Sequence, residues 1–182
     1  MFKKVVSLVA LLALVLTACA CAAGSPVSWP TAPVTCVSSI PGVTTTASPL
    51  TPAAAALKDS LAGKTAAEFV GDEFKLNAIA GGIVPADVDF SKYSVAAMFS
   101  LSIAGYQAGM GDMTVVFPVE PKLNATDNVL GAAGIINGAD VAWNPVAAKV
   151  NADGACEATF TEDLINTIQN GTGESVFAIL VG

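Results

Sequence analysis

The sequence contains no histidine and no arginine, and its eight basic residues are all lysines. Without histidine, the chain cannot hold a Ser-His-Asp or Cys-His catalytic arrangement, or a histidine-ligated zinc or iron site. Without arginine, it has no guanidinium group to bind a carboxylate or phosphate through two parallel hydrogen bonds. The chemistries that remain are those of carboxylate pairs, lysine, and cations bound by oxygen.

Positive charge is scarce as well, since 8 lysines face 15 acidic residues and the formal net charge at pH 7 is −7. Nucleic-acid binding needs a cationic face that neutralises phosphates, so we expect no nucleic-acid partner. Two facing carboxylates are enough for glycoside hydrolysis, but fifteen acids make some proximity unavoidable. We therefore expect a non-catalytic protein and keep a carboxylate-based hydrolase as the less favoured alternative.

A short apolar run at residues 5–16 follows Lys3 and Lys4. A basic start, a short apolar core and small residues after it are typical of a secretory signal. The run has about a dozen residues, whereas a helix that spans a bilayer needs roughly 20. The sequence LTAC at 16–19 then matches the bacterial lipobox. This match predicts a signal peptide at residues 1–18 and a lipid anchor directly after it.

Cys19 and Cys21 decide how the exported protein is attached. Lipidation of Cys19 predicts a membrane partner, because two or more acyl chains hold a protein stably on a bilayer. Ordinary cleavage near Ala22 also satisfies the rule of small residues, and it would release a secreted protein that lacks both cysteines. Both alternatives stay open, and both predict an extracytoplasmic location.

Cys36 and Cys156 remain in the chain after either cleavage. Outside the cytoplasm two such cysteines can pair, so we expect a Cys36–Cys156 disulfide. The loop that this bond would close is long, and loss of unfolded-chain entropy would contribute about 4 kcal/mol.

Proline, serine, threonine and alanine are frequent in residues 19–50. This composition predicts a tether, with a first strand at 35–40. We expect the folded domain at 51–182, beginning with helices. Thr51-Pro52 predicts the start of one helix, and Gly63 is expected to end that helix.

Thr65 and Glu68 match a capping box, so a second short helix is expected there. Gly71 is expected to end it. Another short helix is expected after Thr161.

A period of two follows and predicts strands. In 94–103 one face would carry Val95, Ala97, Phe99, Leu101 and Ile103. Further strands are expected at 113–119, 129–136, 156–160 and 175–181, whereas 139–150 holds Trp143 and a break at Pro145. The last of these strands is apolar on both faces, which places it in the middle of a sheet. Short strands separated by turns predict a mainly β fold, a β-sandwich of about 7–8 strands with two or three short helices.

The segments MTVVFPVEP, VAWNPVAAKVNADGACEATFT and EDLINTIQNGTGESVFAILVG share a pattern, carried by Thr114, Val116, Phe117, Trp143, Gly154 and Phe160. Through this pattern, the stretch 90–182 resembles the Ig-like β-sandwich modules found in uncharacterised secreted and cell-surface proteins of Gram-positive bacteria. The resemblance implies an extracellular β module. It implies no catalytic residues.

Three aspartates are candidate Ca²⁺ ligands, because calcium prefers oxygen donors. They are Asp87, Asp89 and Asp112, the last in a glycine-rich loop. Their spacing does not match an EF-hand, and Asp87 and Asp89 also fit a turn before a strand. We expect no other cofactor.

The glycine-rich loop 105–112 is the candidate ligand site, with Tyr106 and Asp112 as binding residues. An exposed aromatic ring in a loop is suited to glycan binding, although a tyrosine with a solvated hydroxyl at a strand end explains Tyr106 equally well.

The sequence as a whole predicts an exported, lipid-anchored cell-surface module with a structural, adhesion or binding role. The alternative is an extracellular accessory lipoprotein that binds a glycan or a small ligand. Cell-wall glycans, host glycans and other surface proteins are the expected partners besides the membrane.

Overall fold

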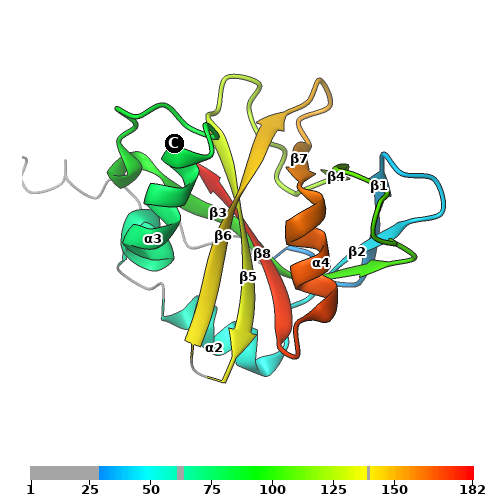
Figure 1. Cartoon of the computed structure of the whole chain (residues 1–182). Helices are drawn as coiled ribbons and strands as arrows, with labels where there is room; N and C mark the ends of the chain where they lie inside the picture. Colours follow the sequence, from blue (N-terminus) through cyan, green and yellow to red (C-terminus); the bar gives the residue numbers. More distant parts are fainter. Residues whose placement is uncertain (1–28, 61–63, 139) are drawn as a thin grey trace, which may run out of the picture.

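A computed structural model describes residues 29–60, 64–138 and 140–182, so the predicted signal and lipobox, with Cys19 and Cys21, lie outside the described residues. Within these ranges eight antiparallel strands form a closed barrel in the order β1-β2-β3-β8-β5-β6-β7-β4 (Figure 1). The strands are β1 (Val34–Ser38), β2 (Thr44–Ser48), β3 (Ser94–Ala104), β4 (Met113–Phe117), β5 (Val129–Asn137), β6 (Asp140–Val150), β7 (Cys156–Phe160) and β8 (Glu174–Val181). The helices are α2 (Pro52–Asp59), α3 (Ala66–Ala80), the 3₁₀ helix η1 (Phe90–Lys92) and α4 (Glu162–Asn170).

The mainly β prediction is confirmed, but the Ig-like sandwich is wrong. Strand β1 pairs with β2 on one side and with β4 on the other, which closes a single sheet on itself. A sandwich instead consists of two separate sheets packed face to face. Both architectures alternate inward and outward side chains along every strand, so a period of two cannot distinguish them.

The segment predicted as a tether contributes to the barrel from Trp29 onward. Strands β1 and β2 both come from it, and β2 was missed because 44–48 is rich in threonine and follows a turn. The Trp29 side chain is buried and its ring meets that of Phe99 edge-on, with centroids 5.1 Å apart. The folded unit therefore begins well before residue 51.

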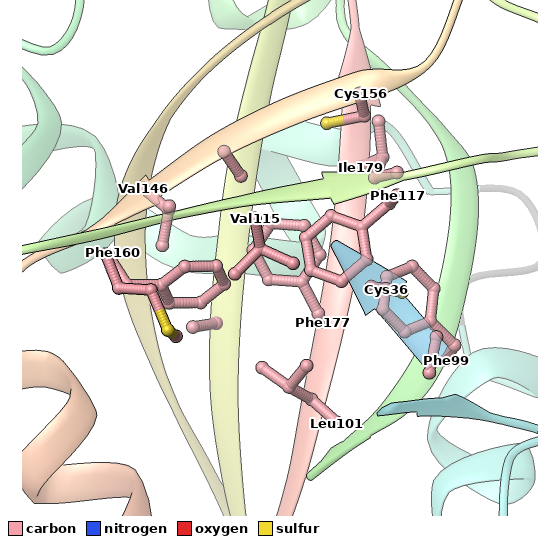
Figure 2. Close-up of a cluster of buried hydrophobic side chains, with 14 of the residues drawn as sticks. Cys36, Phe99, Leu101, Val115, Phe117, Val146, Cys156, Phe160, Phe177 and Ile179 are labelled. Atoms are coloured by element: carbon pink, nitrogen blue, oxygen red, sulfur yellow. The ribbon is translucent and has the colours of Figure 1, made fainter. Parts of the chain in front are cut away.

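Phenylalanine rings fill the centre of the barrel. The ring of Phe177 lies 5.6 Å from Phe99, 5.0 Å from Phe117 and 5.3 Å from Phe160, between centroids (Figure 2). Leu164, Ile165 and Ile168 of α4 belong to the same buried cluster, so this helix packs against the barrel interior. The centre is thus a packed core, as in many eight-stranded barrels.

A second apolar layer covers the outer face of β3, β8, β5 and β6. It is built by α2, α3 and η1, and Figure 1 shows α3 and α4 on opposite sides of these strands. Trp143 of β6 contacts Phe69 of α3, with ring centroids 4.7 Å apart. Strand β8 pairs with β3 and β5 and is buried on both faces, which confirms its predicted place in the middle of a sheet.

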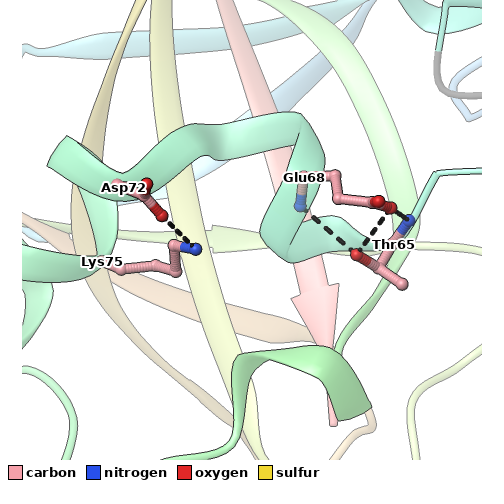
Figure 3. Close-up of polar contacts among 4 residues, drawn as sticks. All are labelled: Thr65, Glu68, Asp72 and Lys75. Atoms are coloured by element: carbon pink, nitrogen blue, oxygen red, sulfur yellow. Dashed lines mark hydrogen bonds and ion pairs between the residues drawn. The ribbon is translucent and has the colours of Figure 1, made fainter.

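The predicted helix starts are confirmed by their capping bonds. Thr65 and Glu68 form the capping box of α3, and backbone and side-chain hydrogen bonds from Thr65 lower the pKa of Glu68 (Figure 3). Gly71, with φ of 80°, breaks the helix as expected, but a second helical stretch follows it. There Lys75 contacts Asp72 at 2.6 Å. No helix in the described ranges is both long and apolar enough to cross a membrane.

Strand β3 contains a β-bulge at Ala96. Val95 is opposite Leu180 and Ala97 is opposite Ile179, so Ala96 has no partner on β8. The extra residue moves Val95 to the outer layer, whereas Ala97, Phe99 and Leu101 stay inside the barrel. The prediction that Val95 shares a face with Ala97 is therefore wrong.

In place of the expected Cys36–Cys156 disulfide the structure has two free, buried thiols. Val37 is opposite Val116 and Phe117 is opposite Cys156, so Cys36 and Cys156 lie on either side of Phe117 (Figure 2). Two strand spacings separate their Cα atoms by about 10 Å, beyond the roughly 7 Å that a disulfide spans. Burial raises the pKa of Cys36 to about 11 and that of Cys156 to about 12, which leaves little thiolate at neutral pH.

Candidate functional site

The barrel has two different ends. At the α4 end, β3 finishes, β4 begins and α4 packs against the core. At the cleft end, β3 begins, β8 finishes and the segment 118–128 connects β4 to β5. The residues predicted as ligand contacts lie at the α4 end, whereas the cleft described below lies at the other.

Tyr106 supports the loop 105–112 and is not an exposed binding residue. Its side chain is only 5 % exposed, and its hydroxyl donates to the Gly111 carbonyl oxygen at 2.8 Å. Gln169 of α4 donates to the Tyr106 carbonyl oxygen at 3.4 Å. Burial, together with the negative charges of Glu162 and Asp112, raises the pKa of Tyr106. The predicted glycan platform is therefore a buried support of the loop.

Glu162, in the first turn of α4, binds the same loop and was missed from the sequence. Its carboxylate accepts the Gly109 N–H at 2.6 Å and the Gly111 N–H at 3.2 Å. Its own N–H, the first of the helix, donates to Asp112 Oδ1 at 3.0 Å, which adds to the capping of α4 by Thr161. The only sequence signal was an acid after the N-cap Thr161, and that position is common for purely local reasons.

Replacing Glu162 with alanine is expected to loosen the loop 105–112. Loss of two charge-assisted bonds to a partly exposed carboxylate should speed amide hydrogen exchange at Gly109 and Gly111 about fivefold, the equivalent of about 1 kcal/mol. Asp163→Ala is the matched control, because it removes a neighbouring acid from the same helical turn. Equal exchange in the two variants would contradict the role given to Glu162.

The three aspartates proposed for Ca²⁺ are not brought together. Asp87 and Asp89 precede β3 at the cleft end, while Asp112 precedes β4 at the α4 end. Asp89 Oδ1 accepts the Ser91 N–H at 3.1 Å and the Ser91 hydroxyl at 2.6 Å, which lowers the pKa of Asp89. Across the described ranges, no group of three or more carboxylate or cysteine side chains is placed to hold a metal ion.

A cleft of about 270 Å³ opens at the cleft end of the barrel, next to the bulge at Ala96. Its walls come from the first residues of β3, the last residues of β8, and the segment between β4 and β5. The lining residues are Ser94, Val95, Ala96, Ala97, Val119, Glu120, Pro121, Lys122, Leu123, Asn124, Asp127, Ile179 and Val181. Apolar side chains form most of this surface, and the polar groups come mainly from 120–127.

Hydrogen bonds and a close backbone contact fix the segment over the cleft. The Leu123 N–H donates to the Gly154 carbonyl oxygen at 2.9 Å, which ties the segment to the turn between β6 and β7. Gly154 has φ of 76°, and a Cβ there would lie 3.0 Å from Lys122 Cβ. Asp127 accepts the Asn124 N–H at 2.9 Å and closes a turn at the end of the segment.

Sequence reasoning missed this cleft although part of its signal was visible. The segment PVEPKLNATDN contains two prolines, charges and a turn pattern, which indicate a loop. That the loop crosses the beginning of β3 depends on the order of strands in the closed barrel. The cleft could therefore not be placed before the topology was known.

Comparison with known proteins gives no assignment, because no family model, no curated protein and no solved structure matches the chain.

Proposed function

We propose that this protein is an exported, non-catalytic binding protein that takes a small, mainly apolar ligand in the cleft at Ala96. The observation that carries the proposal is the cleft itself, an apolar hollow bordered by polar groups from a well-fixed segment. Pockets of this composition are the usual sites of small ligands. Attachment through a lipidated Cys19, or secretion after cleavage near Ala22, would place the cleft outside the cytoplasm.

The volume limits what the cleft can hold. At about 270 Å³ the cleft lies at the lower limit of the roughly 300–1,000 Å³ that is usual for small-ligand pockets. A ligand at the small end of the usual range therefore suits it. A polysaccharide chain would have to lie across its mouth, so a small molecule fits the volume better than an extended glycan.

The bulge in β3 forms part of the cleft wall. Ala96 has no partner on β8, and β2 pairs with β3 only as far as Ser100. The Ala96 backbone therefore lies outside the regular register of both neighbouring strands, at the wall of the cleft. Bulges of this kind are frequent beside binding sites.

A titration with indole, a neutral bicyclic probe of comparable size, tests the proposal. We expect amide NMR shifts that saturate at residues 95–97, at Leu123 and at Ile179. Ala96→Phe should abolish them, because the added ring occupies the cleft. Ala104→Phe is the matched control, since it places the same ring at an exposed position on the same strand. Shifts that are absent, that lie elsewhere, or that survive in Ala96→Phe would overturn the proposal.

A further inference from the structure

Two charged side chains on the border of the cleft have no partner among the described residues. Ser94 donates to the Val181 carbonyl oxygen at 3.4 Å, and Asn124 and Asp127 bind each other. The remaining charged lining groups are the Glu120 carboxylate and the Lys122 ammonium, which make no hydrogen bond or ion pair in the part of the chain that the structure describes. The cleft border therefore offers one carboxylate, that of Glu120, and one ammonium group, that of Lys122, without a partner in the described ranges, besides the Asp127 carboxylate that Asn124 already binds.

These two charges do not neutralise each other although they are only two residues apart. Other lysines with an acid close by do form ion pairs, such as Lys149 with Glu157 at 2.9 Å. Between Glu120 and Lys122 stands Pro121, whose ring restricts the backbone. The stem of Lys122 lies along the Gly154 backbone, since a Cβ on Gly154 would meet Lys122 Cβ at 3.0 Å and Cδ at 3.5 Å. This contact holds the lysine stem against the turn between β6 and β7.

We infer that the ligand of the cleft is a zwitterion with an apolar side group, and that free hydrophobic α-amino acids are its class. Such a molecule presents an ammonium group to Glu120, a carboxylate to Lys122, and a hydrocarbon side chain to the partly exposed Leu123 and Val181. Leucine and phenylalanine are small molecules, as suits a cleft at the lower limit of the usual volume range. This inference rests on the proposed function, because it assigns the ligand of the same cleft.

The charged groups should add discrimination to an affinity that comes mainly from the apolar surface. Glu120 and Lys122 are both exposed, and exposed ion pairs have small effects on binding. We therefore expect each pairing to contribute about fivefold at most to the dissociation constant. Experiments at about 0.15 M salt would limit nonspecific attraction of cations to this acidic protein.

The test compares L-leucine with 4-methylpentanoate, which lacks the ammonium group, and with isopentylamine, which lacks the carboxylate. L-leucine should bind about fivefold more tightly than either. In Glu120→Gln its affinity should fall by that factor, while 4-methylpentanoate is unaffected. In Lys122→Met the affinity of L-leucine should fall similarly, while isopentylamine is unaffected. Amide NMR shifts in the cleft report both affinity and place.

Glu73→Gln and Lys64→Met are the matched controls, because both residues are exposed and neither lines the cleft. They should leave every dissociation constant unchanged. Equal affinity for the three ligands, binding outside the cleft, or losses that do not follow the missing charge would overturn the zwitterion inference. If indole still binds in the cleft, the proposed function survives that result, whereas failure of indole and L-leucine together overturns both.

Discussion

Phe177→Ala is expected to lower the free energy of unfolding by about 3–5 kcal/mol, the usual cost of removing a buried phenylalanine ring. Phe177 is fully buried, and its ring contacts those of Phe99, Phe117 and Phe160 at the centre of the barrel. It also lies on β8, a strand enclosed by two others, so the surrounding backbone has little freedom to close the cavity. The loss is a large part of the stability of a typical domain.

Urea denaturation followed by tryptophan fluorescence measures this effect as a lower midpoint with an unchanged slope. Val37→Ala is the control, because the Val37 side chain is 71 % exposed and its truncation should change stability by less than about 0.5 kcal/mol. A loss below about 1.5 kcal/mol in Phe177→Ala would mean that the four rings do not form the packed centre described above.

Gly131→Ala is expected to lower the free energy of unfolding by about 1–3 kcal/mol through overpacking. A Cβ at this position would lie 2.6 Å from Phe177 Cζ and 3.0 Å from Val146 Cβ, closer than such atoms approach in folded proteins. Gly131 is buried on β5 opposite Ile179 of β8, so the added methyl group points into the core.

A double-mutant cycle with Phe177→Leu tests the cause of that loss. Leucine lacks the ring atom that a Cβ on Gly131 would meet, so Gly131→Ala should cost less in the Phe177→Leu background. Denaturation of the four proteins should give a coupling free energy of at least about 0.5 kcal/mol. Strictly additive losses would show that the methyl group is accommodated without contact to the ring.

The sequence predicted the features that depend on neighbouring residues. The N-caps Thr51, Thr65 and Thr161 are all found, because each is a bond between a side chain and a backbone group three residues ahead. The strands of the C-terminal half are found for a similar reason, since burial on one face imposes alternation. These patterns need no knowledge of which strands are neighbours.

The features that the sequence did not predict depend on contacts across the barrel. Closure requires pairing of β1 with β4, whose residues Val37 and Val116 are far apart in the chain. The bulge at Ala96 lies among small and apolar residues, so no polar side chain marks the change of face. The distance between Cys36 and Cys156 depends on the same register. The location of the cleft depends on these same contacts across the barrel. The sequence therefore indicated the loop residue Tyr106 as a ligand contact and did not indicate the cleft.

The position of β8 in the sheet has a consequence for the order in which the chain can fold during synthesis. Residues 174–181 are synthesised after all other strands, yet they lie between β3 and β5 and carry Phe177 into the core. The barrel cannot close until this segment has left the ribosome, and pairing of β3 with β8 joins residues far apart in sequence, which slows folding. A nascent chain would therefore be unable to form the closed barrel until residues 174–181 have been synthesised.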